Sequence, residues 1–340
     1  MNKELIKWSE QFKQLPWRKK RTLYSTLVSE IMLQQTTVGT VLNHFDKFMN
    51  EYSTIFKLAE ASEEQLTISW KGLGYYRRAR NLKKACEFIV EEFQGEIPLD
   101  YDLLITIPGI GPYTASAIIA IGANKPALAV DANLERVLAR FYALDARKGP
   151  SLQKAIYQRF QEEQIANEIH TLGPRKLNEA LMDLGRNICK SKRASCELCP
   201  LSSNCQAANL NKALEYPKQN AKSKKAYSFE LELVRLIVKK NNQILVYQKN
   251  EKEWLSGQWE TPTFILKSQD KDLKQYPLLK KKISLKKSKS VKTGITKYKI
   301  TNHVIEMSYA EFQKNFKSSK YQFKTMSSKS NLSSSLAKFI

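Results

Sequence analysis

Four cysteines lie within a seventeen-residue segment, and their spacing limits what this part of the chain can fold into. Cys189, Cys196, Cys199 and Cys205 follow the pattern C-x6-C-x2-C-x5-C. Four thiolates this close can surround one metal centre. The pattern favours an iron–sulfur cluster over zinc, because zinc sites usually use two short C-x2-C pairs that are farther apart. A disulfide pair is the alternative, but the N-terminus does not resemble a secretory signal, and thiols stay reduced in the cytosol. The fifth cysteine, Cys86, is expected to be a small buried residue of a helix.

The chain is strongly basic. It has 56 Lys and Arg against 33 Asp and Glu in 340 residues, a net charge of +23. This balance favours a polyanionic partner, although a basic protein that is merely soluble would share it. No apolar run approaches the length of a membrane span, so a soluble intracellular protein of two or three domains is expected.

The pattern of apolar residues changes along the chain. Residues 1–210 are predicted to be mostly helical, with breaks at Gly or Pro. Helical spacing recurs in 21–33, 38–49, 62–69, 78–93, 101–107, 113–121, 132–142, 151–159 and 175–188. The Lys-rich segment 211–228 has no core pattern and is predicted to be a linker. Two alternating runs around Asn241-Asn242 then predict a β-hairpin, so an α domain is followed by a smaller α+β domain over 229–340.

Glu30 lies on the apolar side of the helix predicted over 21–33. At about 100° per residue it shares one stripe with Leu23, Leu27 and Gln34. A buried glutamate without a cation resists ionisation, so its pKa rises and it can donate a proton near neutral pH. From this helix alone, the more ordinary interpretation is a glutamate at the edge of the stripe that reaches solvent or pairs with an arginine.

Asp131 directly precedes a helical pattern and is predicted to be its N-cap, accepting N–H groups of residue 133 or 134. These donors and the positive helix end favour the ionised carboxylate. An uncharged glutamic acid and an ionised aspartate in one cleft could divide the work at an oxocarbenium-like centre. One would protonate the leaving group and the other would stabilise the cation.

Two further segments have features of nucleic-acid binding. Pro108-Gly109-Ile110-Gly111 joins two apolar helical runs, and its glycines let the backbone approach a phosphate; an ordinary helix–turn–helix connection is the alternative. In 70–85, Tyr75 and Tyr76 are interleaved with basic residues, so aromatic side chains could wedge between bases while cations meet phosphates. The alternative is a solvated basic helix face with half-buried tyrosines. The basic residues are Arg77, Arg78, Arg80, Lys83 and Lys84.

Together these motifs resemble the helix–hairpin–helix DNA glycosylases of the endonuclease III superfamily, and more closely their adenine-specific MutY type. The resemblance covers residues 1 to about 210. It is carried by the four cysteines and by SEIMLQQT, LITIPGIGPYTA, AVDAN, Pro16-Trp17-Arg18, GLGYYRRARNL and LNEALMDLGRNIC. It implies an all-α glycosylase core with an iron–sulfur domain and a C-terminal α+β Nudix-like domain. The six-helix domain would cover about 22–130 and the cluster domain 1–21 with 131–210.

The resemblance also implies an activity. Glu30 would protonate N7 of an adenine paired with 8-oxoguanine or G, and Asp131 would stabilise the oxocarbenium ion. Tyr113 and Asn133 would support them. Tyr113 occupies the position of the Schiff-base lysine of bifunctional relatives, which implies a monofunctional enzyme; Lys125 is nearby but does not match the motif.

The implied partners are duplex DNA and a [4Fe-4S] cluster, in a monomeric, cytoplasmic, nucleoid-associated protein without a membrane contact. Gln35 and Tyr75 would enter the duplex, and Gly109 and Gly111 would grip its backbone. The cluster would be structural and would shape a basic loop around Lys190, Lys192 and Arg193.

The C-terminal match is weaker. EWLSGQWETP (253–262) resembles the family's lesion-recognition domain, without a Nudix catalytic box. Where the family has a Phe-Ser-His loop, Thr301-Asn302-His303 is the plausible counterpart, with Asn302 and His303 as lesion contacts. The segment 280–299, with nine Lys and no acid, would touch DNA nonspecifically or form a solvated loop.

Two other functions remain open from the sequence. One is another glycosylase of the superfamily, for oxidised pyrimidines or mismatched thymine; Tyr113 and the C-terminal domain disfavour a bifunctional pyrimidine enzyme. The other is a noncatalytic DNA-binding module held by its cluster, which would need neither Glu30 nor Asp131.

Overall fold

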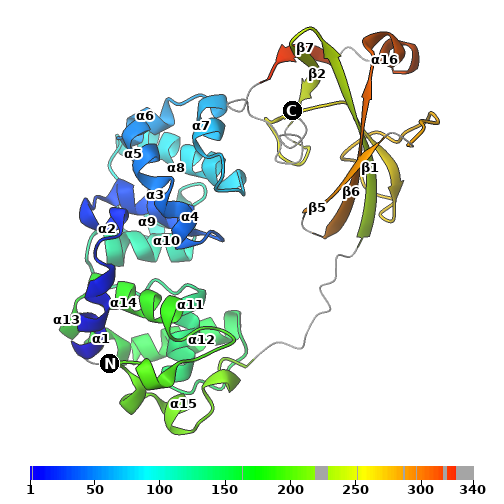
Figure 1. The fold of residues 1–340 in the computed structure, drawn as a ribbon. Helices are drawn as coiled ribbons and strands as arrows, with labels where there is room; N and C mark the ends of the chain where they lie inside the picture. The colour runs from blue at the N-terminus through cyan, green and yellow to red at the C-terminus, as the bar shows by residue number, and fades with distance from the viewer. Residues whose placement is uncertain are drawn as a thin grey trace. The chain divides into compact units, whose positions relative to one another are not determined.

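The computed structural model describes residues 1, 3–162, 164–218, 229–250, 252–285, 288–295, 297–316 and 320–326. The chain divides into two compact units (Figure 1). The first, the α unit, comprises Met1–Ser62 and Gly72–Ser223; the second, the sheet unit, comprises Glu63–Lys71 and Lys224–Ile340. Residues 63–71 thus join the sheet unit, although the sequence analysis expects them in the helical domain. Among the described residues, no helix combines the length and apolar character needed to cross a membrane.

The α unit consists of short helices. These are α1 (Lys3–Ser9), α2 (Pro16–Lys19), α3 (Leu23–Leu33), α4 (Val38–Leu42), α5 (Phe45–Glu51), α6 (Ile55–Ala59), α8 (Arg77–Phe93), α9 (Tyr101–Thr106), α10 (Pro112–Ala117), α11 (Ala132–Phe141), α12 (Pro150–Gln161), α13 (Gln164–Leu172), α14 (Pro174–Asn187) and α15 (Gln206–Asn209). The expected helix over 38–49 is two helices, α4 and α5, with a break at Asn43-His44. Helices α1, α2, α6, α13 and α15 lie outside the segments for which helical spacing was predicted; α6, for example, is a five-residue helix that Thr54 caps.

Local chemistry sets the helices that carry the candidate site. Thr22 and Ser25 form a capping box at the start of α3, because each side chain accepts the other's backbone N–H. Helix α10 begins at Pro112 and continues as a π-helical turn over Ile118–Gly122. Gly109, with φ +86°, lies so close to α8 that an added Cβ would be 2.8 Å from the Cβ of Asn81. The hairpin before α10 therefore needs glycine both for its turn and for its packing.

One hydrophobic cluster joins α1 to helices α11–α14. Leu134, Leu138 and Leu181 are fully buried within it. Cys189, Cys199 and Cys205 pack against the same cluster, so the cysteine loop is attached to the helices that follow Asp131.

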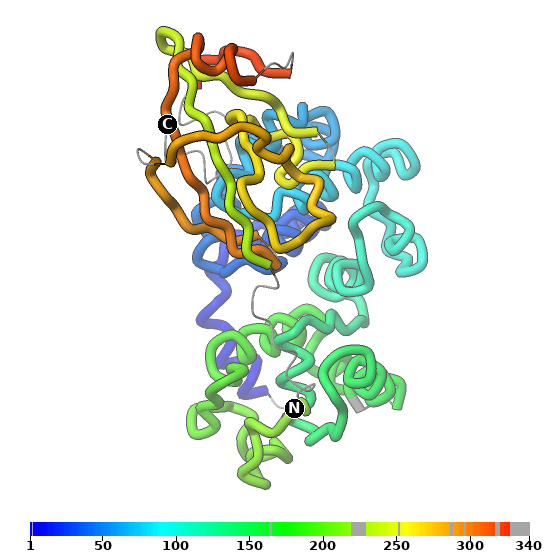
Figure 2. Tube along the Cα trace, turned by 90° about the vertical axis from the view of Figure 1, so that its right-hand side faces the viewer, coloured from blue at the N-terminus to red at the C-terminus, as the bar shows by residue number. Residues whose placement is uncertain are grey.

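The sheet unit contains a seven-stranded sheet (Figure 2). Its elements are β1 (Phe229–Lys240), β2 (Gln243–Gln248), β3 (Trp259–Glu260), β4 (Thr263–Ser268), β5 (Lys289–Ile295), β6 (Tyr298–Met307) and β7 (Gln322–Thr325), with helices α7 (Glu63–Ser69) and α16 (Tyr309–Asn315). The strand order is β3-β2-β1-β6-β5, with β4 paired to β1 and β7 paired to β2. Strand β1 runs parallel to β6 and antiparallel to β2 and β4.

The predicted hairpin is confirmed, because Lys240 pairs with Gln243 across Asn241-Asn242. Asn241 has φ 52°, a conformation that asparagine tolerates better than most residues. Of the predicted linker over 211–228, residues 219–228 lie outside the described part of the chain. Residues 286, 287 and 296 of the Lys-rich segment also lie outside it. The rest of that segment includes β5.

Candidate active site

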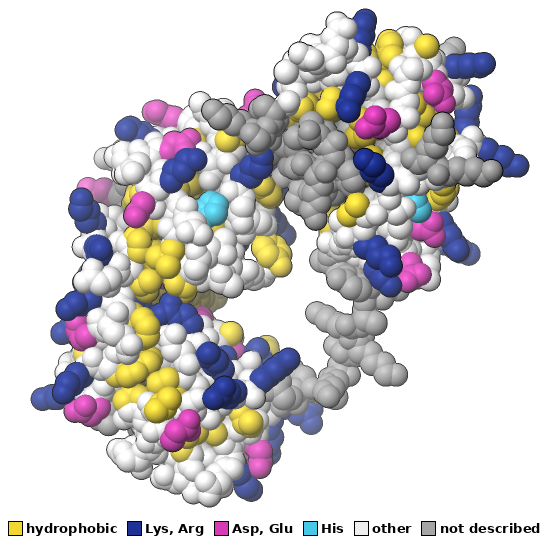
Figure 3. All heavy atoms as spheres, viewed as in Figure 1, with side chains coloured by type: hydrophobic (Ala, Val, Ile, Leu, Met, Phe, Trp, Pro, Cys, Tyr) yellow, Lys and Arg dark blue, Asp and Glu magenta, His cyan; other side chains and the backbone are white. Residues whose placement is uncertain are grey.

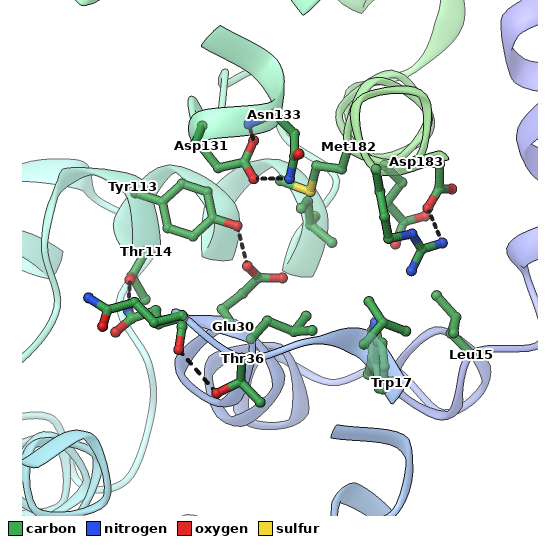
Figure 4. A pocket seen from close by; sticks show the side chains of 18 of the residues that line it. Leu15, Trp17, Glu30, Thr36, Tyr113, Thr114, Asp131, Asn133, Met182 and Asp183 are labelled. Atoms are coloured by element: carbon green, nitrogen blue, oxygen red, sulfur yellow. Dashed lines mark hydrogen bonds and ion pairs between the residues drawn. The ribbon is translucent and has the colours of Figure 1, made fainter. Parts of the chain in front are cut away.

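A cavity of about 910 Å³ opens in the α unit. It is lined by residues from α3, the turn after α3, the start of α10, the start of α11, and α14. Glu30, Tyr113, Asp131 and Asn133 all face this cavity (Figure 4). The structure thus brings together the four residues that the resemblance singles out, although they come from three separate helices and an N-cap.

Glu30 is buried in α3, with 5% of its surface exposed. The Tyr113 hydroxyl donates a hydrogen bond to its carboxylate Oε2. Burial raises the pKa of Glu30 to about 7, while the hydrogen bond from Tyr113 acts in the opposite direction. Within the described residues no cation forms an ion pair with Glu30. The interpretation of Glu30 as an edge residue that reaches solvent or pairs with an arginine is therefore wrong.

Asp131 is the N-cap of α11, as predicted. Its Oδ1 accepts the backbone N–H groups of Asn133 at 2.9 Å and Leu134 at 2.7 Å, and its Oδ2 accepts Asn133 Nδ2 at 2.7 Å. Burial raises the pKa of Asp131, while these three donors lower it. The three hydrogen bonds favour the carboxylate as expected, but they do not fully offset the rise in pKa that burial causes.

Arg136 connects this N-cap to the cysteine loop, and sequence reasoning missed it. Its Nη2 donates to Asn133 Oδ1 at 2.9 Å, and its Nε donates to the Cys189 carbonyl at 2.6 Å. Its position one turn after Asn133 on the same helix face was the available signal. Helix α14 also packs tightly here, since an added Cβ on Gly185 would lie 2.6 Å from Asn133 Cβ.

The predicted DNA-entering residues lie on two turns of the α unit. Gln35 follows α3 and lines the cavity, and Tyr75 precedes α8 with 63% of its surface exposed. Both have positive φ, 54° for Gln35 and 47° for Tyr75. Such backbone strain in residues other than glycine persists only where the surroundings impose it.

Four of the five basic residues around Tyr75 fall into two groups, and the fifth, Arg80, is half-buried. Arg77 and Lys84 are exposed. Arg78 is buried and donates to backbone carbonyls, and Lys83 donates to Glu87 and to the Ala59 carbonyl at 2.9 Å. The interpretation of this whole set as phosphate contacts or a solvated face is therefore wrong for Arg78 and Lys83. On the face of the molecule drawn in Figure 3, Lys and Arg side chains are spread among Asp and Glu.

The four clustered cysteines line one small cavity together with Arg140. All five cysteines of the chain are free thiols, so the disulfide alternative is wrong, and Cys86 is fully buried as expected. Arg140 Nη1 lies 3.2 Å from Cys189 Sγ, where its N–H can donate to a thiolate. Within the described residues no three His, Cys, Asp or Glu side chains meet the geometry of a site for one metal ion. A [4Fe-4S] cluster instead takes one thiolate per iron, so four cysteines around a cavity fit it better than zinc.

The expected lesion loop is part of a strand. Thr301-Asn302-His303 lies in the middle of β6, and Asn302 is fully buried. Asn302 Oδ1 accepts from Arg235 Nε at 2.8 Å, and its Nδ2 donates to Val291 O at 3.0 Å. The expected lesion contact by Asn302 does not fit this placement, because its polar groups are already used inside the sheet unit. His303 points to the opposite side of the strand, where it bonds Ser290 at 3.0 Å.

Similarity to known proteins extends over part or most of the chain, depending on the protein. Residues 28–163 match the family described as HhH-GPD superfamily base excision DNA repair protein. The adenine DNA glycosylase of Buchnera aphidicola subsp. Schizaphis graminum is 34% identical over 313 residues, which cover 91% of this chain and 86% of that protein. The adenine DNA glycosylase of Arabidopsis thaliana is 33% identical over 300 residues, covering 77% of this chain and 47% of that protein. Among solved structures, a thermostable thymine-DNA glycosylase is similar with a TM-score of 0.52 and 26% identity, over 61% of this chain and 94% of that one.

Proposed function

The chain belongs to the adenine DNA glycosylases, the MutY type of the helix–hairpin–helix superfamily, and on this premise we propose that it removes adenine paired with 8-oxoguanine or guanine in duplex DNA. As a member of this family it is a base excision repair enzyme that hydrolyses an N-glycosidic bond. The substrate pair, the residue roles and the single-function mechanism are the proposal.

One observation carries the mechanism: Glu30 is a buried carboxyl with a pKa of about 7 that faces Asp131 across one cavity. Near neutral pH a large fraction of Glu30 is protonated and can donate its proton to adenine N7. The C1′–N9 bond then breaks with its electron pair on the base. Adenine leaves as a neutral molecule, and the sugar becomes an oxocarbenium ion.

Asp131 is placed to stabilise that cation. Three hydrogen bonds to its carboxylate, two of them from backbone N–H groups at a helix N-terminus, favour the ionised form more than the single phenol does at Glu30. Water then adds to C1′ and loses a proton, which leaves an abasic site. Asn133 holds the Asp131 carboxylate, and Tyr113 holds that of Glu30.

The cavity lining supports a monofunctional enzyme. Bifunctional relatives need an amine that forms a Schiff base with the sugar. Among the described residues that line the cavity there is no lysine, and Tyr113 at the matching position is bonded to Glu30. Strand cleavage is therefore expected only after alkali.

Several features support DNA as the partner of a monomeric, nucleoid-associated protein. The net charge is +23. The hairpin with Gly109 and Gly111 leads into the N-terminus of α10, and Gly109 is exposed to solvent. Gln35 and Tyr75 are exposed on neighbouring turns, as residues that enter a duplex must be. Lesion recognition is assigned to the sheet unit as a Nudix-like domain; in the Thr301–His303 segment, His303 keeps exposed atoms whereas Asn302 does not.

A [4Fe-4S] cluster would be held by Cys189, Cys196, Cys199 and Cys205. It would stabilise the conformation of the cysteine loop rather than supply redox chemistry. Arg140 would donate to a cluster sulfur ligand, and Arg136 would hold the loop backbone against α11.

The proposal is tested by single-turnover base release from four short duplexes: A opposite 8-oxoguanine, A opposite G, thymine glycol opposite A, and T opposite G. Fast adenine release opposite 8-oxoguanine, with strand breakage only after alkali, is expected. The last duplex is included because of the similarity to a thymine-DNA glycosylase. Activity on a pyrimidine without adenine release would overturn the proposal, and no release from any duplex would favour a DNA-binding module.

A further inference from the structure

Arg78 is a buried cation inside the α unit that the proposed chemistry does not use. It lies in the first turn of α8, with 8% of its surface exposed. A buried guanidinium is costly unless its N–H groups are satisfied. Where those N–H groups point therefore indicates what the residue is for.

One side of the guanidinium binds the turn after α3. Nη1 donates to the carbonyls of Ile31 at 2.9 Å, Met32 at 2.7 Å and Gln34. The first two belong to the last turn of α3, where the helix dipole favours a cation. The third directly precedes Gln35.

The other side binds the turn before α8. Nη2 donates to the carbonyls of Leu73 at 2.9 Å and Gly74 at 3.2 Å, and also to Thr36 Oγ1 at 2.8 Å. Thr36 Oγ1 in turn donates to the Leu73 carbonyl at 3.3 Å. The guanidinium carbon also lies 5.6 Å from the centre of the Tyr75 ring. One planar side chain thus spans two turns that are about forty residues apart in sequence.

Each of these turns presents one exposed residue other than glycine with positive φ, Gln35 or Tyr75. The left-handed conformation is unfavourable for a residue other than glycine, so the surroundings must hold each turn. The hydrogen bonds of Arg78 end on the residues just before Gln35 and Tyr75. The turn after α3 also lines the cavity, so the same bonds fix the rim of the site.

We propose that Arg78 is the positioning residue that holds the Gln35 and Tyr75 turns at a fixed separation, so that both side chains enter the duplex together as the target base leaves the stack. This inference rests on the proposed function. Filling the space left by a flipped base offsets its unstacking cost only if the inserted groups are already in place. Lysine cannot replace arginine here, because one ammonium cannot span both turns.

The test uses Arg78→Lys, with Arg147→Lys as the matched control. Arg147 is an exposed arginine of the α unit between α11 and α12 that does not line the cavity, so the control makes the same chemical change without touching the turns. Both changes are made in the full chain, alone and together with Glu30→Gln, which keeps the base attached. Base flipping is followed by the fluorescence of 2-aminopurine placed at the target position opposite 8-oxoguanine, and circular dichroism confirms folding.

We expect Arg78→Lys to lose most of the fluorescence rise and to lower the single-turnover rate at saturating enzyme about 100-fold. As pH rises, its rate should decline with the same midpoint pH as that of the wild type, because Glu30 is unchanged. Arg147→Lys should match the wild type in both. A folded Arg78→Lys variant that flips the base normally, or that is slow with a normal fluorescence rise, overturns the proposal.

Thr36 gives a milder second test if Arg78→Lys does not fold. Thr36→Val removes the hydroxyl that joins Arg78 to the second turn, and Thr36→Ser keeps it. A loss of about fivefold in flipping and rate is expected for Thr36→Val alone. Equal behaviour of the two variants overturns the proposal. Failure of the proposed function would look different: the wild type would flip the fluorescent base yet release no adenine.

Discussion

Each unit of this protein buries a glutamate, and the two glutamates have opposite surroundings. Glu30 in the α unit has a phenol as its hydrogen-bond donor and faces a cavity of about 910 Å³. Glu260 in the sheet unit is fully buried and pairs with Arg235 at 2.5 Å and Lys249 at 3.7 Å. Burial alone therefore does not identify a catalytic carboxyl.

The partners of Glu260 make further hydrogen bonds inside the sheet unit. Arg235 also donates to Asn302, and Lys249 donates to the Tyr276 hydroxyl at 2.7 Å. Two cations thus flank the single carboxylate of Glu260 within the core, and the group links β1, β3 and β6. Among the described residues Glu30 has no such cation partner, so burial raises the pKa of its carboxyl, which faces the cavity. The comparison teaches that the functional signal is the missing counter-charge together with the cavity.

The largest expected effect is the loss of catalysis in Glu30→Gln. Glutamine keeps the shape but has no acidic proton, so the single-turnover rate of adenine release should fall by about 10²–10⁴-fold. DNA binding, followed by electrophoretic mobility, should persist. Glu260→Gln is the matched control, and its rate per folded molecule on A opposite G should be normal. A Glu30→Gln enzyme with a near-normal rate would remove the contrast between the two glutamates.

Glu260→Gln should instead destabilise the sheet unit. The change leaves Arg235 and Lys249 buried without a counter-charge, which costs about 3–5 kcal/mol. Hydrogen exchange of amides in β1 and β3 measures the free energy of opening of this unit. A decrease in this free energy of less than about 1 kcal/mol would mean that the ion pairs of Glu260 contribute no more than exposed salt bridges do.

Tyr113→Phe should have a smaller effect on rate and a diagnostic effect on pH dependence. Loss of one hydrogen bond should slow release about fivefold. Because that bond lowers the pKa of Glu30, its removal should move the decline in rate to higher pH. Tyr142→Phe, in a half-buried tyrosine that does not line the cavity, is the control. A shift to lower pH would contradict the assigned hydrogen bond.

The smallest effect concerns stability. The folded-state pKa of Glu30 is about 7 against an ordinary value of 4.5, so the folded state keeps a proton that the unfolded state releases between these values. Wild-type stability contributed by this group is therefore present below pH 4.5 and is lost as pH rises to about 7. Glutamine does not titrate, so the melting temperature of Glu30→Gln should rise relative to wild type over this range and then level off. A difference that stays constant with pH would place Glu30 in contact with water.

Local signals predicted much of the site. The N-cap role of Asp131 follows from the residues just after it, and the cysteine cluster follows from spacing alone. The burial of Glu30 could not be predicted from its helix, because the residue that bonds it, Tyr113, lies 83 positions along the chain. The contacts of Arg78 could not be predicted either, because they join turns that lie far apart in sequence.

The sheet unit was harder to predict because strand pairing is not local. Asn302 is buried because β6 lies between β1 and β5, where it pairs with Leu233 and Val291. A signal was nonetheless present: Tyr298, Ile300 and Val304 alternate with a period of two, which places Asn302 on their buried face. A resemblance to a loop motif took precedence over that alternation, and the structure shows that the alternation was correct.

The most direct measurement is the titration of Glu30 itself. Infrared difference spectra between the wild type and Glu30→Gln, taken from pH 4 to pH 9, isolate the C=O stretch of this one protonated carboxyl. A band that disappears with a midpoint near pH 7 is the predicted result. A carboxyl already ionised at pH 5.5 would contradict the assignment of Glu30 as the acid.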